Sequence, residues 1–436
     1  MEELKKGSKK LLHAWAFYDW ANSVYSLVIA SAIFPIFYGA LFRSAGIEEI
    51  EVFGVLLRRS PLIFYTTALA FLIVSFISPL LSGIADYVGN KLNFLKFFCY
   101  LGSFSTIGLY WFSLEHIYLS LLCYLLALVG FWASLVFYNS YLPDIAYPEQ
   151  QDAISAKGYS LGYIGSVILL VLCLGMILGH EALGFESEAL PTKLSFVLTG
   201  LWWAGFSQYT YAYLPKGNKT GKKVTRSVLT NGFRELRSIA YEVQQQLALK
   251  RYLIAFFVFS MAVQTVMLAA AYFGEQELEW GSDSERTTGL ITSILLIQLV
   301  AVVGAQLTAR LSAKIGNIPA LITINILWIL ICIYAYFVVL PVQFYIAAGF
   351  VGLVMGGIQA LARSTYAKLL PETKDTTSYF SFYDVAEKIG IVLGMFLYGY
   401  VEQLTGSMRY SILFLIVFFV AGVLLLLRVP RPKRVE

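Results

Sequence analysis

The chain has 436 residues, of which 58% are hydrophobic and only 14% are charged, and its formal net charge is +5. A soluble chain of this length carries roughly a quarter of its residues as charged side chains. The composition therefore excludes a soluble globular protein and predicts an all-α membrane protein that crosses the bilayer many times.

Twelve stretches of the chain are long and apolar enough to span a bilayer, which takes about 20 helical residues. We predict them at residues 14–38, 61–85, 93–114, 117–141, 155–179, 194–214, 252–273, 288–311, 318–340, 343–369, 379–404 and 409–428. They form an N-terminal six-helix half at 1–214 and a C-terminal six-helix half at 252–436, joined by a linker at 215–251. Most Lys and Arg residues lie in the tails and in the loops on one side, which predicts that both termini are cytoplasmic.

The first predicted helix carries a polar stripe. Asp19, Asn22 and Ser23 are spaced i, i+3, i+4 and therefore share one helical face. Their carboxylate and carbonyl oxygens could bind the ammonium group of an amino acid, or Asp19 could be a structural acid that hydrogen-bonds a neighbouring helix. The sequence leaves both interpretations open, and Asp19 and Asn22 are candidate substrate-binding residues.

The loop after the second predicted helix contains Gly83, Asp86, Gly89 and Lys91. Gly83 allows two helices to approach closely, and Gly89 permits a tight turn. Asp86 could meet a helix N-terminus or a cation at the membrane surface, and Lys91 is placed to face lipid headgroups.

The linker is the longest polar stretch of the chain. It begins with a flexible basic segment at 216–223, and the part from about Leu229 to Ala248 predicts a basic amphipathic helix. This helix could be a regulatory or lipid-sensing element, or a tether that lies on the anionic leaflet, and we favour the tether.

Several further polar side chains lie inside or at the ends of predicted helices. Those that we count as candidate substrate contacts are Tyr138, Asn139, Gln264 and Gln359. Arg363 could hold a carboxylate through two parallel hydrogen bonds or extend to the inner membrane surface, and we favour the second. Two glycine series, 158/162/165 and 352/356/357, predict close helix packing.

The eleventh predicted helix contains Tyr383, Asp384, Glu387 and Lys388. A charge near the middle of the bilayer costs about 2.5–3.5 kcal/mol on insertion scales, so such residues are paired, hydrated or functional. Asp384 and Lys388 can pair at i,i+4. The group could be a substrate or proton site, which we favour, or a structural ion-pair network; all four residues are candidate substrate contacts.

A short set of residues occurs twice along the chain at an offset of about 225–228 residues. The matched positions are Pro143 and Pro371, Gly89 and Gly316, and Gly165 and Gly390. Three matches at nearly one offset predict two duplicated halves, which is typical of transporters that close around a central site.

The 83–91 loop, the twelve spans and the duplicated halves resemble the major facilitator superfamily. The stretches at 15–23, 137–143, 352–364 and 382–388 are similar to the vacuolar amino-acid effluxer family, whose bacterial members form the unknown major facilitator family. The superfamily resemblance implies that Gly83, Asp86, Gly89 and Lys91 gate the cytoplasmic side. We group Arg363 with these gating residues.

The sequence contains no H-E-x-x-H zinc motif and no phosphate-binding G-x-x-x-x-G-K-[ST] loop. We therefore expect no metal, no cofactor and no enzymatic activity, and transport that is facilitated or driven by an ion gradient. Asp19, Asp384 or Glu387 could carry a coupling proton.

These features predict a transporter of small solutes that works by alternating access. The resemblance implies that the solutes are amino acids, and we expect efflux. The alternatives are an exporter of drugs, sugars or nucleosides, or a transporter-like receptor. We expect a monomer in the bacterial inner membrane, with a small-molecule substrate and lipid as its partners and no nucleic acid.

Overall fold

The computed structural model of the chain describes residues 4–47, 49–217 and 237–430, with side chains except at 58–61, 64, 283–284, 287 and 403. The chain divides into two compact units. Unit 1 comprises Met1–Tyr141 and Leu161–Gly232, and unit 2 comprises Leu142–Ser160 and Phe233–Glu436.

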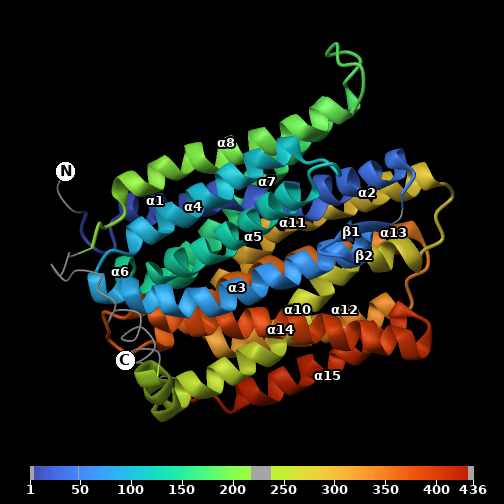
Figure 1. Cartoon of the computed structure of the whole chain (residues 1–436). Coiled ribbons are helices and arrows are strands. Elements are labelled where there is room, and N and C mark those ends of the chain that lie inside the picture. The colour runs from blue at the N-terminus through green and yellow to red at the C-terminus, as the bar shows by residue number, and fades with distance from the viewer. Residues whose placement is uncertain (1–3, 48, 218–236, 431–436) are drawn as a thin grey trace. The chain divides into compact units, whose positions relative to one another are not determined.

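Unit 1 is built from long helices and one small hairpin (Figure 1). Its elements are α1 (Lys9–Val24), η1 (Tyr25–Ile33), α2 (Phe34–Ala45), β1 (Glu49–Val52), β2 (Val55–Arg58), α3 (Arg59–Val88), α4 (Lys91–Gly108), η2 (Leu109–Trp111), α5 (Ile117–Ser140), the later part of α7 (Pro148–Leu178) and α8 (Ala189–Tyr213). Because α1, η1 and α2 follow one another without a break, they correspond to a single predicted span.

Unit 2 contains the helices coloured from yellow-green to red in Figure 1. They are α10 (Leu247–Gln276), α11 (Asp283–Ile315), α12 (Asn317–Tyr336), α13 (Pro341–Leu369), α14 (Thr376–Thr405) and α15 (Met408–Leu427). The short α6 (Leu142–Ile145) and the first turns of α7, coloured teal, also belong to unit 2.

The all-α membrane fold predicted from the sequence is confirmed, because every predicted span falls on a helix. Ten helical segments of the described residues are long and apolar enough to cross a membrane. The two other predicted spans are α8 and α14, which have the length but a more polar composition. In α14 the charged residues 384, 387 and 388 contribute to that polarity.

The two units repeat the same packing. In unit 1, α8 packs on α1 and α4, and α5 packs on α3 and α4. In unit 2, α15 packs on α10 and α12, and α13 packs on α11 and α12. Each helix pair of unit 1 has its counterpart six spans later, so the predicted pseudo-repeat is present in the fold.

One segment of the predicted N-terminal half belongs to the other packing unit. Residues 142–160, which include the first turns of α7, pack with unit 2, and α7 then continues as one helix into unit 1. The boundaries 1–214, 215–251 and 252–436 stay a prediction, and the packing units differ from them in this segment.

The hairpin of β1 and β2 was not predicted. Its two-residue turn is Phe53-Gly54, and both residues have positive φ angles, 52° and 77°. Such a turn matches the twist of two antiparallel strands and normally favours Asn or Gly at its first position. The Phe53 backbone N–H donates to the Tyr118 hydroxyl at 3.1 Å, so tertiary contact supports a turn that the sequence does not announce.

The described part of the linker contains a helix at residues 237–245. Because α10 begins at Leu247, Ala248 belongs to α10 and not to the linker helix. Residues 229–236 of the predicted amphipathic helix lie outside the described residues. Ile239 and Val243 are buried, and Glu242 accepts a hydrogen bond from the Tyr379 hydroxyl at 2.7 Å. The segment is therefore fastened to the start of α14.

The residue before α14, Asp375, shares this region. Burial raises the pKa of the Asp375 carboxyl, and the charge of Glu242 raises it further. The Thr373 hydroxyl, which donates to Asp375, acts in the opposite direction. Two carboxylates thus lie near each other where the linker helix meets α14.

The glycine series on α13 allows the close packing of α13 on α11, as predicted. A Cβ added at Gly356 would overlap the carbonyl oxygen of Ala301, whereas a Cβ at Gly349, on the same helix, would meet no atom within 4 Å. We expect Gly356→Ala to destabilise the protein by about 1–3 kcal/mol because backbone has to move. Gly349→Ala should instead be neutral or stabilise it by about 0.5–1 kcal/mol, since alanine is the better helix former. Thermal unfolding of the two variants in detergent tests the pair, and equal melting temperatures would contradict the packing.

Candidate functional site

Four polar side chains meet inside unit 2 and form what we call the α14 cluster: Gln264, Asp384, Glu387 and Lys388. The Lys388 ammonium donates to Asp384 Oδ1 at 2.5 Å and to Glu387 Oε2 at 3.3 Å. From α10, Gln264 Nε2 donates to Glu387 Oε1 at 2.8 Å. The helical spacing 384, 387, 388 places the three charges on one face of α14, and the packing of α10 on α14 supplies the amide.

The α14 cluster is buried. Asp384 is 6% exposed and Lys388 is 1% exposed, and the Glu387 side chain is the most open of the charged three at 18%. Two carboxylates and one ammonium leave one net negative charge when all are ionised. Asp384 lies eight residues into α14, about 12 Å along the helix axis, so the charge is far from the start of the helix.

The other predicted residues of unit 2 lie on the same helices. Tyr383 is buried and stacks on Phe256 with 4.0 Å between ring centroids. Gln359 of α13 is half-buried, and its Nε2 lies 3.5 Å from the sulfur of Met267. Neither contact joins these two side chains to the charges of the α14 cluster, although Tyr383 directly precedes Asp384 in sequence.

In unit 1, Asp19 and Tyr138 are brought together. The Tyr138 hydroxyl donates to Asp19 Oδ2 at 2.9 Å, and the Trp15 ring stacks on the Tyr138 ring at 4.6 Å. Asn22 is buried, accepts from the Ser23 hydroxyl at 3.3 Å, and its Nδ2 has no partner among the described residues. Asn139 is half-buried at the end of α5.

The helix type changes from α to π directly after the polar stripe of Asp19, Asn22 and Ser23. Residues Tyr25–Ile33 form the π-helical segment η1 within the long first span. π-Helical turns are rare and occur often at functional sites, because they shift the helical face by part of a turn. The sequence showed no signal for this segment.

Loss of the Tyr138 hydroxyl tests the Asp19 contact. We expect Tyr138→Phe to lower the stability of the protein by about 1–3 kcal/mol, because a buried carboxylate oxygen loses a donor. Tyr65→Phe, at an exposed tyrosine of α3, is the matched control and should leave the melting temperature unchanged. If both variants melt together with the parent, the hydrogen bond does not contribute to folding.

The predicted gating loop lies between α3 and α4. Gly89 has a φ of 68°, which fits the predicted tight turn, and Gly83 is buried in α3. Asp86 is half-buried. Lys91 donates to the Ser140 carbonyl at 3.1 Å and lies 4.3 Å from the centroid of the Tyr141 ring. Lys91 therefore binds the end of α5.

Arg363 belongs to unit 2 and is only 2% exposed. The prediction that its side chain extends to the membrane surface is therefore wrong. Its Nε donates to the Ser155 hydroxyl and its Nη2 to the Ser155 carbonyl, each at 2.9 Å. The guanidinium also lies 4.3 Å from the centroid of the Tyr159 ring. Arg363 thus binds the first turns of α7.

A second contact of α7 was missed by the sequence analysis. Asp152 accepts hydrogen bonds from side chains of three helices: Lys368 of α13 at 2.7 Å, Ser312 of α11 at 2.9 Å and Asn317 of α12 at 2.9 Å. With Ser155, Tyr159 and Ser160, Asp152 forms one polar face of α7, which we call the α7 stripe. Ser160 accepts from Gln306 Nε2 at 3.0 Å.

The spacing 152, 155, 159 and 160 is the signal that could have revealed the α7 stripe. The predicted span began at 155 and so placed Asp152 in a loop. The helix starts seven residues earlier, at Pro148.

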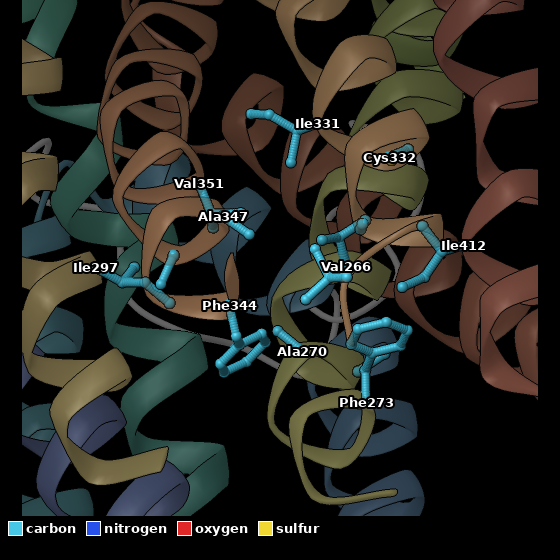
Figure 2. Close-up of a pocket in the computed structure, with 14 residues that line it drawn as sticks. Val266, Ala270, Phe273, Ile297, Ile331, Cys332, Phe344, Ala347, Val351 and Ile412 are labelled. Atoms are coloured by element: carbon cyan, nitrogen blue, oxygen red, sulfur yellow. The ribbon is translucent and has the colours of Figure 1, made fainter. Parts of the chain in front are cut away.

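Unit 2 also contains an apolar cavity of about 40 Å³ between α10, α11, α12, α13 and α15. Figure 2 shows Val266, Ala270 and Phe273 of α10 opposite Phe344 and Ala347 of α13. All fourteen lining residues are apolar or cysteine. Such a lining offers a charged solute no hydrogen-bond or ion-pair partner, unlike the side chains of the α14 cluster. Within the described ranges, no group of three or more His, Cys, Asp or Glu side chains could hold a metal ion.

Comparisons with known proteins identify similar sequences along nearly the whole chain. A family model described as "Vacuole effluxer Atg22 like" matches residues 7–436. The chain is 31% identical to the "Uncharacterized MFS-type transporter YxiO" of Bacillus subtilis, over 98% of this chain and 96% of that protein. It is 23% identical to "Autophagy-related protein 22" of Eremothecium gossypii, over 94% and 88% of the two chains.

Solved structures show the same fold at low sequence identity. The major facilitator transporter FucP in an outward conformation has a TM-score of 0.70 and 14% identity, with 97% of this chain and 99% of that chain covered. The human organic anion transporter MFSD10 has a TM-score of 0.68 and 13% identity, with 96% and 98% covered.

Proposed function

The chain belongs to the Atg22-like family of vacuole effluxers within the major facilitator superfamily, and from that premise we propose that it carries amino acids across a bacterial inner membrane and exports them. It is a multi-pass membrane transporter and not an enzyme.

The observation that carries the proposal is the α14 cluster. A buried group of two carboxylates, one ammonium and one amide is expensive inside a membrane and adds little to stability on its own. Amino acids carry complementary charged groups. The matching family is described as a vacuole effluxer, which supports efflux from a compartment. The resemblance of the sequence to vacuolar amino-acid effluxers supports the solute class.

Alternating access needs groups that form and break contacts as the halves move. We propose a gating role for Gly83, Asp86, Gly89 and Lys91 of the 83–91 loop in unit 1 and, separately within unit 2, for Arg363 with the α7 stripe that it binds. With both termini in the cytoplasm, α7 starts at that side. We also propose that the protein works as a monomer and that Asp19, Asp384 or Glu387 is the coupling acid if transport uses a proton gradient.

Thermal stabilisation of the purified protein tests the solute class, because a ligand that binds only the folded state raises the melting temperature. The panel comprises amino acids, sugars, nucleosides and cationic drugs at equal concentration. We expect stabilisation by amino acids alone, followed by saturable uptake of the same amino acids into proteoliposomes. Stabilisation by another class only would refute the amino-acid proposal, and binding without uptake would indicate a receptor. A pH gradient that does not change the uptake rate would exclude proton coupling.

A further inference from the structure

The hydrogen-bond acceptors of the α14 cluster are unequally occupied. Both oxygens of Glu387 accept a hydrogen bond, one from Gln264 and one from Lys388. Asp384 Oδ1 accepts from Lys388. Asp384 Oδ2 is buried and accepts no hydrogen bond from any described residue. The α14 cluster therefore lacks one donor at a defined atom.

The cluster also lacks one positive charge. Lys388 is in contact with both carboxylates, at 2.5 and 3.3 Å, and therefore neutralises only one of the two charges. A buried carboxylate oxygen without a donor retains its full desolvation penalty. The missing partner is thus a group that brings both a positive charge and N–H donors.

We propose that Asp384 Oδ2 binds the ammonium group of the transported solute, so that the α14 cluster recognises the amino end of the substrate and not its carboxylate. This inference rests on the proposed function only for the identity of the solute as an amino acid. Glu387, at i+3 from Asp384 on the same face, is the most open of the three charged side chains.

The same contacts argue against the opposite assignment, in which Lys388 binds the solute carboxylate. Lys388 is 1% exposed and already binds two carboxylates. A third carboxylate would raise the negative charge of a buried group and oppose binding. A bare proton would neutralise the charge but would add an O–H donor that in turn needs an acceptor. An ammonium ion supplies charge and donors together.

Leucine, two leucine derivatives and one simple amine separate these cases in a thermal-shift titration at fixed pH. Leucine and leucine methyl ester keep the ammonium group, isoamylamine keeps it without any carboxyl group, and N-acetyl-leucine has lost it. We expect the first three to stabilise the full-length protein and N-acetyl-leucine to have no effect. Equal stabilisation by N-acetyl-leucine, or none by any of the three amines, overturns the inference.

Substitutions then locate the binding atom. We expect Asp384→Asn to weaken the apparent affinity for leucine and its ester by at least about tenfold, as loss of a buried charge partner does. Glu402→Gln, on the same helix, is the matched control and should leave the affinity unchanged. If Asp384→Asn does not fold, Asp384→Glu replaces it, because glutamate keeps the charge but moves the oxygen. We expect Asp384→Glu to weaken selectively the binding of the three amines.

The outcomes distinguish this inference from the proposed function. Leucine uptake that survives Asp384→Asn with unchanged affinity refutes the ammonium site and leaves amino-acid transport standing. Binding of isoamylamine that depends on Asp384, with no uptake of any amino acid, refutes amino-acid transport and leaves the ammonium site standing. Loss of gradient dependence in Asp384→Asn, with amine binding intact, assigns the residue to the proton and overturns the inference.

Discussion

Lys388→Met is expected to destabilise the protein by about 3–5 kcal/mol, the range measured when one partner of a buried ion pair is removed. The reason is that Asp384 and Glu387 would remain buried without their shared cation, and Asp384 would have no hydrogen-bond donor left among the described residues. Thermal unfolding in detergent measures the effect as a fall in the melting temperature. Lys250→Met, at an exposed lysine of α10, should change it little.

The double variant Asp384→Asn with Lys388→Met makes this prediction specific. Removal of both charges leaves no unpaired ion at 384, so the double variant should be more stable than Lys388→Met alone. A double variant that loses as much stability as the sum of the two single variants would show that the residues do not interact. Uptake should remain absent in the double variant whatever its stability, if the α14 cluster binds substrate.

Asp152→Ala is the second change with a large expected effect. It removes the acceptor of three donors from α11, α12 and α13 and leaves Lys368 without its carboxylate. We expect a loss of about 2–4 kcal/mol, less than for a fully buried pair because the Lys368 side chain is 24% exposed. If the α7 stripe is part of the gate, the uptake rate should fall as well.

The control for Asp152→Ala is Glu149→Ala, three residues earlier on α7 and exposed. It removes an acid of the same helix end without touching α11 or α13. Comparable melting temperatures for the two variants would contradict the role of Asp152. Partial recovery in Asp152→Asn with Lys368→Met would assign the effect to the charge pair and not to the loss of α7 packing.

Sequence reasoning found the α14 cluster because charged residues are rare within apolar spans, so Asp384, Glu387 and Lys388 were conspicuous. It named Asp19 and Tyr138 separately, but their hydrogen bond depends on how α1 packs on α5, which no local pattern specifies. The helices themselves were predictable because the bilayer requires about 20 apolar residues for each.

The failures have equally physical causes. Asp152 was missed because hydropathy falls at the start of α7 although the helix continues there, covered by polar partners instead of lipid. The hairpin was missed because its turn has Phe53 where Asn or Gly is usual. Arg363 was assigned to the surface because a lone arginine near a helix end usually extends to water, and here Ser155 and Tyr159 bind it instead.

The shared helix α7 has a consequence for biosynthesis. The partners of Asp152 lie 160, 165 and 216 residues further along the chain. At roughly 5–20 residues per second, the ribosome completes Lys368 about 10–40 s after Asp152. During that interval the start of α7 is in or at the membrane with its acid, serines and tyrosine not yet covered. The fifth span of the nascent chain can therefore fold fully only after the second half has been synthesised, or with the help of a chaperone of the insertion machinery.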